Sequence, residues 1–490
     1  MCCGLLMVAV WPAAWCQMQP GGGGPSGQQQ GSSQPEYNSN QTTSPSESSG
    51  TNQSPFLSSV PEGKATGTVL PLSFKDALDR AMRNNLGLLI ASDSSLAARG
   101  KRWEELSHLL PNISASATQS AEQIDLAALG FRFNFPGVPN VIGPIGVFDA
   151  RFYATASIFD WHEIQRVRGA RATESAAQYN YKSARELVVL ATGNEYLLTI
   201  AAAARVDSAQ AQLETAQALY NKAHDQQTAG VTPAIDALRA QVELQTRQQQ
   251  LIAARNNYAK QKLALARTIG LPAGQEFNLT DQEPYQPIPP LSLEQALQRA
   301  YGSRNDYQAA VQQVLAAQQF RRAATSEHYP TLGFMGNYGA AGVNIGDSHG
   351  VFIAGATLDI PIFAGGRSHA DALQAEATLR QSKQQLESLR AQIDYDVRTA
   401  LLDLQSASDQ VQVAKSALDL ANQTLVQARD RFTAGVTDNL EVVEAQDALA
   451  TANENYISSL YAHNVAKISL ARAIGFAEEG VKQYLENKGK

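Results

Sequence analysis

The chain has 490 residues, of which 44% are hydrophobic and 17% charged, and its mean hydropathy is −0.25. This length allows two or three domains with a large core, and this composition does not fit a bundle of membrane-spanning helices. The formal net charge of −7, without a stripe of Lys or Arg, argues against a nucleic-acid partner.

Residues 1–16 contain a long apolar stretch, from Leu5 to Trp15, which is the only one the sequence pattern identifies. It is shorter than the roughly 20 residues of a spanning helix, and we interpret it as a secretory signal peptide. No Lys or Arg precedes it, so we expect the true signal to begin upstream of Met1. All three cysteines lie here: Cys2, Cys3 and Cys16. After removal of this segment the exported chain would lack thiols, which suits an oxidising compartment. The alternative is that Cys16 is retained and carries a lipid, but the bulky Trp15 before it disfavours such a cleavage site.

Residues 17–68 are rich in Gly, Ser, Gln, Pro and Asn, with few apolar side chains. Such a segment buries too little surface to fold, so it is predicted to be a disordered tether. The four glycines at 21–24 lack the Gly-Lys-Ser/Thr of a phosphate-binding loop.

The rest of the chain is a tandem duplication. Thr-Ala-Gly-Val-Thr occurs at 228–232 and again at 433–437, an offset of 205 (433 minus 228). LSFKDAL at 72–78 matches LSLEQAL at 291–297, an offset of 219 (291 minus 72), so the first copy has 14 additional residues (219 minus 205). We assign the first repeat to residues 69–285 and the second to 286–480, followed by a tail at 481–490.

Each repeat predicts a helix, two strands, a very long helix, a tight turn and another helix. The first helices are expected at about 73–109 and 292–328, each ending before a proline that favours extended backbone. The long helical patterns cover about 162–227 and 368–433 without an internal proline. At 1.5 Å per residue, each makes a rod of roughly 100 Å, which must pack lengthwise against other helices.

The packing surface of the long helices follows a 3-4-3-4-3 spacing. Its members are Val206, Ala209, Leu213, Ala216, Tyr220 and Ala223 in the first copy, and Val411, Ala414, Leu418, Ala421, Leu425 and Ala428 in the second. This average period of 3.5 is typical of knobs-into-holes packing. The remaining surface is rich in Ala, Gln and Ser, which favours a curved sheet or tube of helices; a plain coiled coil is the alternative.

Glycines mark the turn that follows each long helix. Gly230 and Gly435 supply the left-handed backbone that ends a helix. We expect Thr232 and Thr437 to cap the next helix, with Pro233 at its first position. Each repeat therefore contains an antiparallel helical hairpin.

Between the helices lie strands of about ten residues. In 148–158 the even positions are apolar and the odd ones largely polar, and 352–360 repeats the pattern. The preceding strands are expected at 112–119 and 331–340. Such alternation fits a transmembrane barrel strand, with a soluble sandwich as the alternative. Four strands cannot close a barrel, so the chain would oligomerise, and three copies would supply twelve strands.

The additional residues of the first copy fall between its two strands, at about 122–147. This stretch includes Phe131, Phe133 and Phe135. Barrel proteins place their long loops on the extracellular side, so we interpret it as an exposed, rather apolar surface loop.

Nothing in the sequence indicates catalysis. The seven histidines are scattered without paired metal-ligand spacing, and no nucleophile-elbow, phosphate-loop or dinucleotide-binding motif occurs. We expect no enzyme activity, no cofactor and no metal site.

Three segments resemble the TolC-like outer-membrane efflux family. RFTAGVTDNLEVVEAQDAL at 431–449 is similar to its hairpin turn, PIFAGGRSHADALQAEA at 361–377 to its strand-to-helix passage, and 304–334 to its helix-to-strand approach. Asn305 occupies a position where the family usually has proline. This departure affects only the start of a helix. The resemblance covers about 70–485 and implies a mostly helical α+β fold.

The resemblance also implies an assembly. Family members are homotrimers, with a 12-stranded β-barrel in outer-membrane lipid and a helical barrel that crosses the periplasm. Through a periplasmic adaptor they serve an inner-membrane pump as a passive exit duct for drugs, small molecules or metals. A type I protein-secretion duct is the first alternative, and a non-conducting periplasmic coiled-coil scaffold the second.

The periplasmic ends of the hairpins are the implied gate and docking site. Acidic rings constrict the family's tunnel just before the hairpin turns, where this chain has Asp225 and Asp430. Arg429 and Arg431, which flank Asp430, are gate candidates as well, and a local surface ion pair of Asp430 with one of them is the alternative. The candidate adaptor contacts are the turn residues themselves: Gly230, Val231, Thr232, Gly435, Val436 and Thr437.

Overall fold

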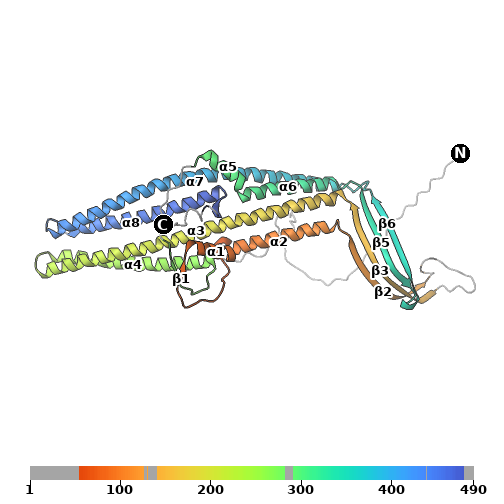
Figure 1. Cartoon of the computed structure of the whole chain (residues 1–490), viewed down its shortest axis with the longest axis horizontal. Helices are drawn as coiled ribbons and strands as arrows, with labels where there is room; N and C mark the ends of the chain where they lie inside the picture. The colour runs from red at the N-terminus through yellow and green to blue at the C-terminus, as the bar shows by residue number, and fades with distance from the viewer. Residues whose placement is uncertain are drawn as a thin grey trace, which may run out of the picture. The chain divides into compact units, whose positions relative to one another are not determined.

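A computed structural model describes residues 54–125, 128, 130, 141–281, 291–437, 439–478 and 480. The predicted signal peptide, most of the predicted tether and the predicted C-terminal tail lie outside these residues. In the described part, helices run side by side and a sheet lies beyond one end of them (Figure 1).

The helices are α1 (Phe74–Asn84), α2 (Leu86–Ser107), α3 (Trp161–Thr228), α4 (Ala234–Ile269), α5 (Leu293–Ser303), α6 (Asn305–Thr325), α7 (Arg367–Thr433) and α8 (Asn439–Ala473). The strands are β1 (Leu70–Leu72), β2 (Asn112–Asp125), β3 (Val141–Phe159), β4 (Phe277–Leu279), β5 (Thr331–Gly342) and β6 (Ser348–Asp359). Two short 3-10 helices are Pro55–Leu57 and Ile345–Asp347. The order repeats the same plan twice, as the duplication predicts.

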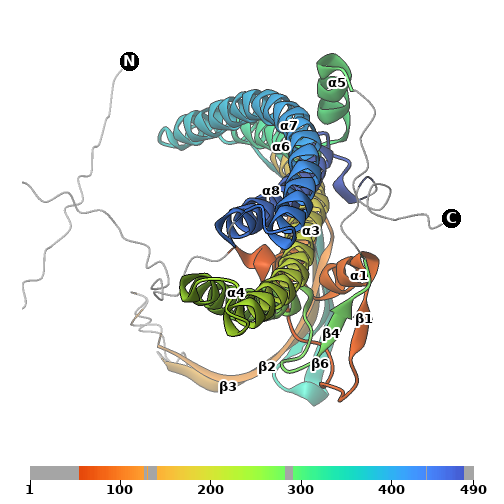
Figure 2. The same ribbon diagram turned by 90° about the vertical axis from the view of Figure 1, so that its left-hand side faces the viewer.

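The two long helices dominate the molecule. α3 has 68 residues and α7 has 67, so each is about 100 Å long at 1.5 Å per residue. α4 folds back on α3, and α8 folds back on α7 (Figures 1 and 2). α3 also contacts α8, which joins the two hairpins. None of the twelve residues of the predicted 3-4-3-4-3 seam is exposed, in agreement with the spacing.

The expected single helices at 73–109 and 292–328 are each broken in two, so that prediction was wrong. The breaks are at Asn85 and Arg304, which occupy the same place in the two repeats. The Asn85 side chain accepts hydrogen bonds from the N–H groups of Gly87 and Leu88 and thereby caps α2. Arg304 is buried and pairs with Asp306 and Asp396. At Asn85 the side chain thus satisfies the broken backbone, whereas Arg304 makes no side-chain cap hydrogen bond and is held instead by its two carboxylate partners.

The end of the predicted tether is ordered, which corrects the prediction for residues 54–68. The N–H of Ser59 donates to the Arg267 carbonyl at 3.1 Å, and the N–H of Val60 donates to the Asn84 carbonyl at 2.8 Å. The Asn85 amide nitrogen in turn donates to the carbonyl of Phe56 at 2.7 Å. The chain segment is held because the break between α1 and α2 leaves backbone groups free to bond it.

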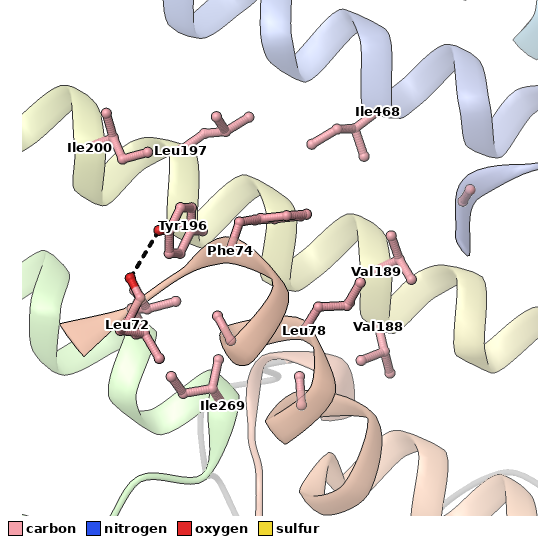
Figure 3. Close-up of a cluster of buried hydrophobic side chains, with 14 of the residues drawn as sticks. Leu72, Phe74, Leu78, Val188, Val189, Tyr196, Leu197, Ile200, Ile269 and Ile468 are labelled. Carbon is pink, nitrogen blue, oxygen red and sulfur yellow. Dashed lines mark hydrogen bonds between the residues drawn. The ribbon is translucent and has the colours of Figure 1, made fainter. Parts of the chain in front are cut away.

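A cluster of buried apolar residues lies where α1, α3, α4 and α8 meet (Figure 3). Phe74 packs edge-on against Tyr196, with ring centroids 5.3 Å apart. The Tyr196 hydroxyl lies 3.1 Å from the Leu72 carbonyl oxygen and 2.8 Å from a carboxylate oxygen of Asp281. Burial raises the pKa of Tyr196, so this group stays protonated.

The sequence pattern missed an apolar stretch inside α3. An 18-residue window there has a mean hydropathy of 1.5, and 56% of it is buried within the chain. Length and composition would let such a helix cross a membrane, but more than half of the window is buried within the chain, as in the core helix of a folded domain.

The long strands form one antiparallel sheet in the order β2-β3-β5-β6. Its register sets Phe152 opposite Tyr338, and Tyr338 opposite Phe352, so the predicted apolar faces lie on one side. β2 ends at Asp125 and β3 begins at Val141, so both strands extend into the predicted 122–147 loop. The expected loop is therefore shorter than predicted, and Phe131, Phe133 and Phe135 lie outside the described residues.

Candidate functional site

The two hairpin ends have the same backbone geometry. Gly230 has φ +73° and Gly435 has φ +69°, both left-handed as predicted. The N–H of Val231 donates to the Gln226 carbonyl at 2.9 Å, and the N–H of Val436 donates to the Arg431 carbonyl at 3.0 Å. These are Schellman turns, which satisfy the last carbonyls of α3 and α7 and leave the valine side chains exposed at the extremity.

The prediction for the cap of α4 was wrong. Its N-cap is Pro233, not Thr232, and it makes no side-chain cap hydrogen bond. Because α4 begins one residue later than expected, the Thr232 hydroxyl is out of reach of the first free N–H groups. In the second repeat, the Thr437 hydroxyl donates to the carboxylate of Glu441, which lies in the first turn of α8.

Near these ends, an apolar cluster joins all four long helices. Its buried members are Leu219, Ala223, Ala240, Leu425, Ala428, Phe432, Val442 and Ala445. At its margin, Lys222 of α3 donates to the hydroxyl of Thr433 at 2.7 Å and lies 5.3 Å from the ring centroid of Phe432. The ends of α3 and α7 are therefore bound to one another within a single chain.

The two candidate gate carboxylates lie on this joined end. Asp225 and Asp430 are exposed, and no ion pair to either carboxylate is found among the described residues. The expected alternative, a pair with a flanking arginine, is not formed, because Arg431 instead pairs with Glu441 at 3.3 Å. Arg429 lines a surface hollow between α3 and α7.

A polar network between the hairpins was not predicted from the sequence. Arg247 of α4 is buried and bonds the carboxylates of Glu243 and Asp447 and the side-chain oxygens of Gln212 and Gln250. It thereby ties α4 to α3 and α8. An arginine flanked by glutamines looks like a solvated helix face in the sequence, so only the assembled hairpins identify it.

The sheet carries a second candidate surface. The apolar face that includes Phe152, Tyr338 and Phe352 is exposed to solvent in the single chain. β2 and β6 are the edge strands, and in the described residues each pairs on one side only. An exposed apolar face and two open edges are unfavourable in water, so both indicate burial against something outside this chain.

Metal chemistry gains no support from the described residues, in which no cluster of three His, Cys, Asp or Glu side chains is placed to hold an ion.

Comparison with known proteins agrees with this geometry. The family model described as outer membrane efflux protein matches residues 78–271 and 296–476, one segment in each repeat. Outer membrane protein TolC of Escherichia coli (strain K12) is 23% identical over 349 residues, covering 67% of this chain and 70% of TolC. Cation efflux system protein CusC of the same strain is 28% identical over 176 residues, covering 35% of this chain and 38% of CusC.

The fold also matches a solved structure. The outer membrane protein VceC from Vibrio cholerae superposes with a TM-score of 0.69 at 17% identity, covering 82% of this chain and 96% of VceC. At that identity the likeness concerns the fold alone. Because both repeats match the family model over most of the chain, the chain belongs to the outer membrane efflux protein family.

Proposed function

We propose that the protein is a trimeric exit duct in the outer membrane, which passively conducts substrates from an inner-membrane pump and a periplasmic adaptor to the exterior. As a member of its family it is an outer-membrane protein and a passive channel. The trimer and the closed barrel are our inferences from the geometry above, and the adaptor and pump are inferred from membership of the family.

The open edges of the sheet carry the proposal. Backbone groups on an unpaired edge cannot be satisfied in lipid, so β2 of one copy must pair with β6 of the next. Three copies of a four-stranded sheet give a barrel of twelve strands, an even number within the range of outer-membrane barrels. The exposed row of Phe152, Tyr338 and Phe352 would then face lipid.

The helices support the same assembly. α4 and α7 keep large apolar side chains exposed in one chain: Ile235, Leu238, Val242, Ile252 and Leu263 on α4, and Leu373, Leu402, Val413, Leu420 and Val426 on α7. Neighbouring copies that cover these residues would bury apolar surface along most of the rod. In this way, three chains would together form a closed tube of helices around an aqueous tunnel.

The hairpin ends are the proposed gate and docking site. Three chains would gather six carboxylates, from Asp225 and Asp430, near the narrow end, and this field would favour cations. The exposed turns at Val231 and Val436 are the proposed adaptor contacts. Because such a duct only guides solutes, the pump supplies the energy and selects drug, metal or protein cargo.

Chemical cross-linking tests the barrel directly. Ser116 on β2 and Val351 on β6 lie in one row of the sheet, on opposite edges. The double variant Ser116→Cys plus Val351→Cys, treated with a flexible bismaleimide in membranes, should give dimers and trimers and nothing larger. Each single-cysteine variant and the unaltered chain are the controls, since equivalent edges do not meet in a threefold ring. Because tilted strands stagger the row where two copies meet, Val351→Cys is also combined in turn with Cys at Ser114, Thr118 and Ser120 of β2. Absence of the trimer in every pair, or an open ladder beyond it, would contradict the closed barrel.

A further inference from the structure

A surface hollow of about 500 Å³ lies between α3 and α7, close to the two hairpin turns. The hairpin ends that form it face the viewer in Figure 2. Residues of α3 between Ala211 and Lys222 form one wall, and Arg429, Phe432 and Thr433 of α7 form the other. Both walls belong to the same chain, so the hollow does not depend on assembly. The gate carboxylates and the exposed valines of the turns are not part of its lining.

Two cationic side chains line the hollow without a carboxylate partner. Neither Lys222 nor Arg429 makes an ion pair in the part of the chain that the structure describes. The Lys222 ammonium donates a hydrogen bond to the Thr433 hydroxyl at 2.7 Å and lies 5.3 Å from the ring centroid of Phe432. Arg429 is exposed. These neutral partners position the ammonium but leave its charge uncompensated, so two positive charges face the hollow.

Negative charges also lie near the hollow. Glu214 lines it, but it precedes Lys222 by eight residues (222 minus 214), about 12 Å along α3 at 1.5 Å per residue. Its carboxylate accepts a hydrogen bond from the Gln210 amide nitrogen at 3.0 Å. Asp225 and Asp430 are exposed outside the lining and form no ion pair with either cation among the described residues. The part of the hollow near the turns therefore has two cations and no carboxylate in its walls.

The duplication provides an internal comparison. At the offset of 205, Lys222 corresponds to Gln427 on α7 (427 minus 222), and Arg429 corresponds to His224 on α3 (429 minus 224). In the proposed trimer, Gln427 and His224 would meet where the second hairpin of one copy adjoins the first hairpin of the next. That groove would contain neither Lys nor Arg at these positions. Only the hollow within each chain would carry the cationic pair.

We propose that the hollow between α3 and α7 is a docking site for an acidic side chain of the periplasmic adaptor, whose carboxylate lies between Lys222 and Arg429. This inference rests on the proposed function, which supplies the adaptor. The guanidinium of an arginine can bind both carboxylate oxygens, while the lysine ammonium adds a point charge. Because charge pairs at an interface determine register and choice of partner, the pair would favour an adaptor with Asp or Glu at this place and disfavour one with Lys or Arg.

Two synthetic peptides test this chemistry without the adaptor. Both are capped helical peptides of Ala and Gln with a neutral fluorophore, and one has a single central Glu where the other has Gln. Their dissociation constants are measured by fluorescence anisotropy on the purified full-length protein in a neutral detergent at low salt. We expect the Glu peptide to bind about threefold tighter or more, and the preference to shrink in about 0.5 M salt. Since the chain has a net charge of −7, a preference for Glu requires a local cationic site. Equal binding of the two peptides would overturn the proposal.

Variants assign the preference to the hollow. Lys222→Gln combined with Arg429→Gln should abolish it. The matched control is Lys260→Gln combined with Lys415→Gln, which removes the same charge from exposed positions outside the hollow and should retain the preference. Arg429→Gln alone changes an exposed side chain and should weaken the preference, which gives an independent reading if the double variant does not fold. An undiminished preference in the folded double variant, or in Arg429→Gln, would refute the site.

Export by a deletion strain tests the adaptor as the occupant. The Lys222→Gln plus Arg429→Gln variant should impair export with normal trimers, while the Lys260→Gln plus Lys415→Gln control should export like the unaltered protein. Normal export by the former variant would overturn the assignment to the adaptor. Failure of the proposed duct would appear differently, as absence of export by the unaltered protein. Peptide binding needs neither conduction nor assembly, so its result is separate from the fate of the duct.

Discussion

Replacing Gly435 with valine should impair export while leaving the trimer intact. At φ +69° an L-residue is strained by about 1–2 kcal/mol, and a β-branched residue is especially disfavoured. A Cβ added at Gly435 meets no atom within 4 Å, so the cost is backbone strain alone. A penalty of 1–2 kcal/mol changes the population of the native turn by about 5- to 30-fold. The Schellman bond from Val436 to Arg431 would be lost with it.

The assay is drug susceptibility of a deletion strain that carries the variant, together with trimer content on unheated gels. Gly435→Asn is the matched control, since asparagine tolerates left-handed backbone and should retain export. Full export by Gly435→Val with normal trimers would refute the role of this turn. Loss of trimers in Gly435→Val would show that the turn supports assembly and would equally contradict the reasoning.

Three further outcomes are expected. Asp225→Asn combined with Asp430→Asn should weaken cation preference in planar bilayers, and unaltered ion selectivity would exclude these carboxylates from the constriction. Lys467→Met should raise the midpoint of thermal unfolding. Lys467 is 2% exposed, its Nζ has no hydrogen-bond partner in the described chain, and burial lowers its pKa to about 8. A lower midpoint in the variant would show that the ammonium has a stabilising partner. The hydrogen bond from Arg166 lowers the pKa of Glu105, so the stability that Glu105 contributes is present above pH 4.5 and is lost as pH falls below that value. The difference in melting temperature between the unaltered protein and Glu105→Gln should therefore shrink on acidification, and a constant difference would argue against the ion pair.

The sequence predicted those features that a local pattern encodes. The 3.5-residue spacing identified the packing seam of the long helices, and alternation identified the faces of β3, β5 and β6 that the register then aligned. Gly230 and Gly435 identified both hairpin turns, since left-handed backbone is a strictly local requirement.

The missed features depend on contacts between distant segments. Asn85 breaks a helix through its own side chain and a bond to Phe56, 29 residues away, without any proline to signal it. The short parallel pair of β1 and β4 joins residues about 207 positions apart. Arg247 and Gln446 lie on helix faces that look solvated, until the two hairpins meet around them. No single-segment pattern carries that information.

The single-channel conductance of the purified protein in a planar lipid bilayer tests the central claim most directly. A water-filled barrel shared by three subunits predicts discrete conductance steps from the trimeric fraction, with a preference for cations. A detergent-stable trimer that carries no current, or a chain that elutes as a monomer and never enters the bilayer, would contradict it.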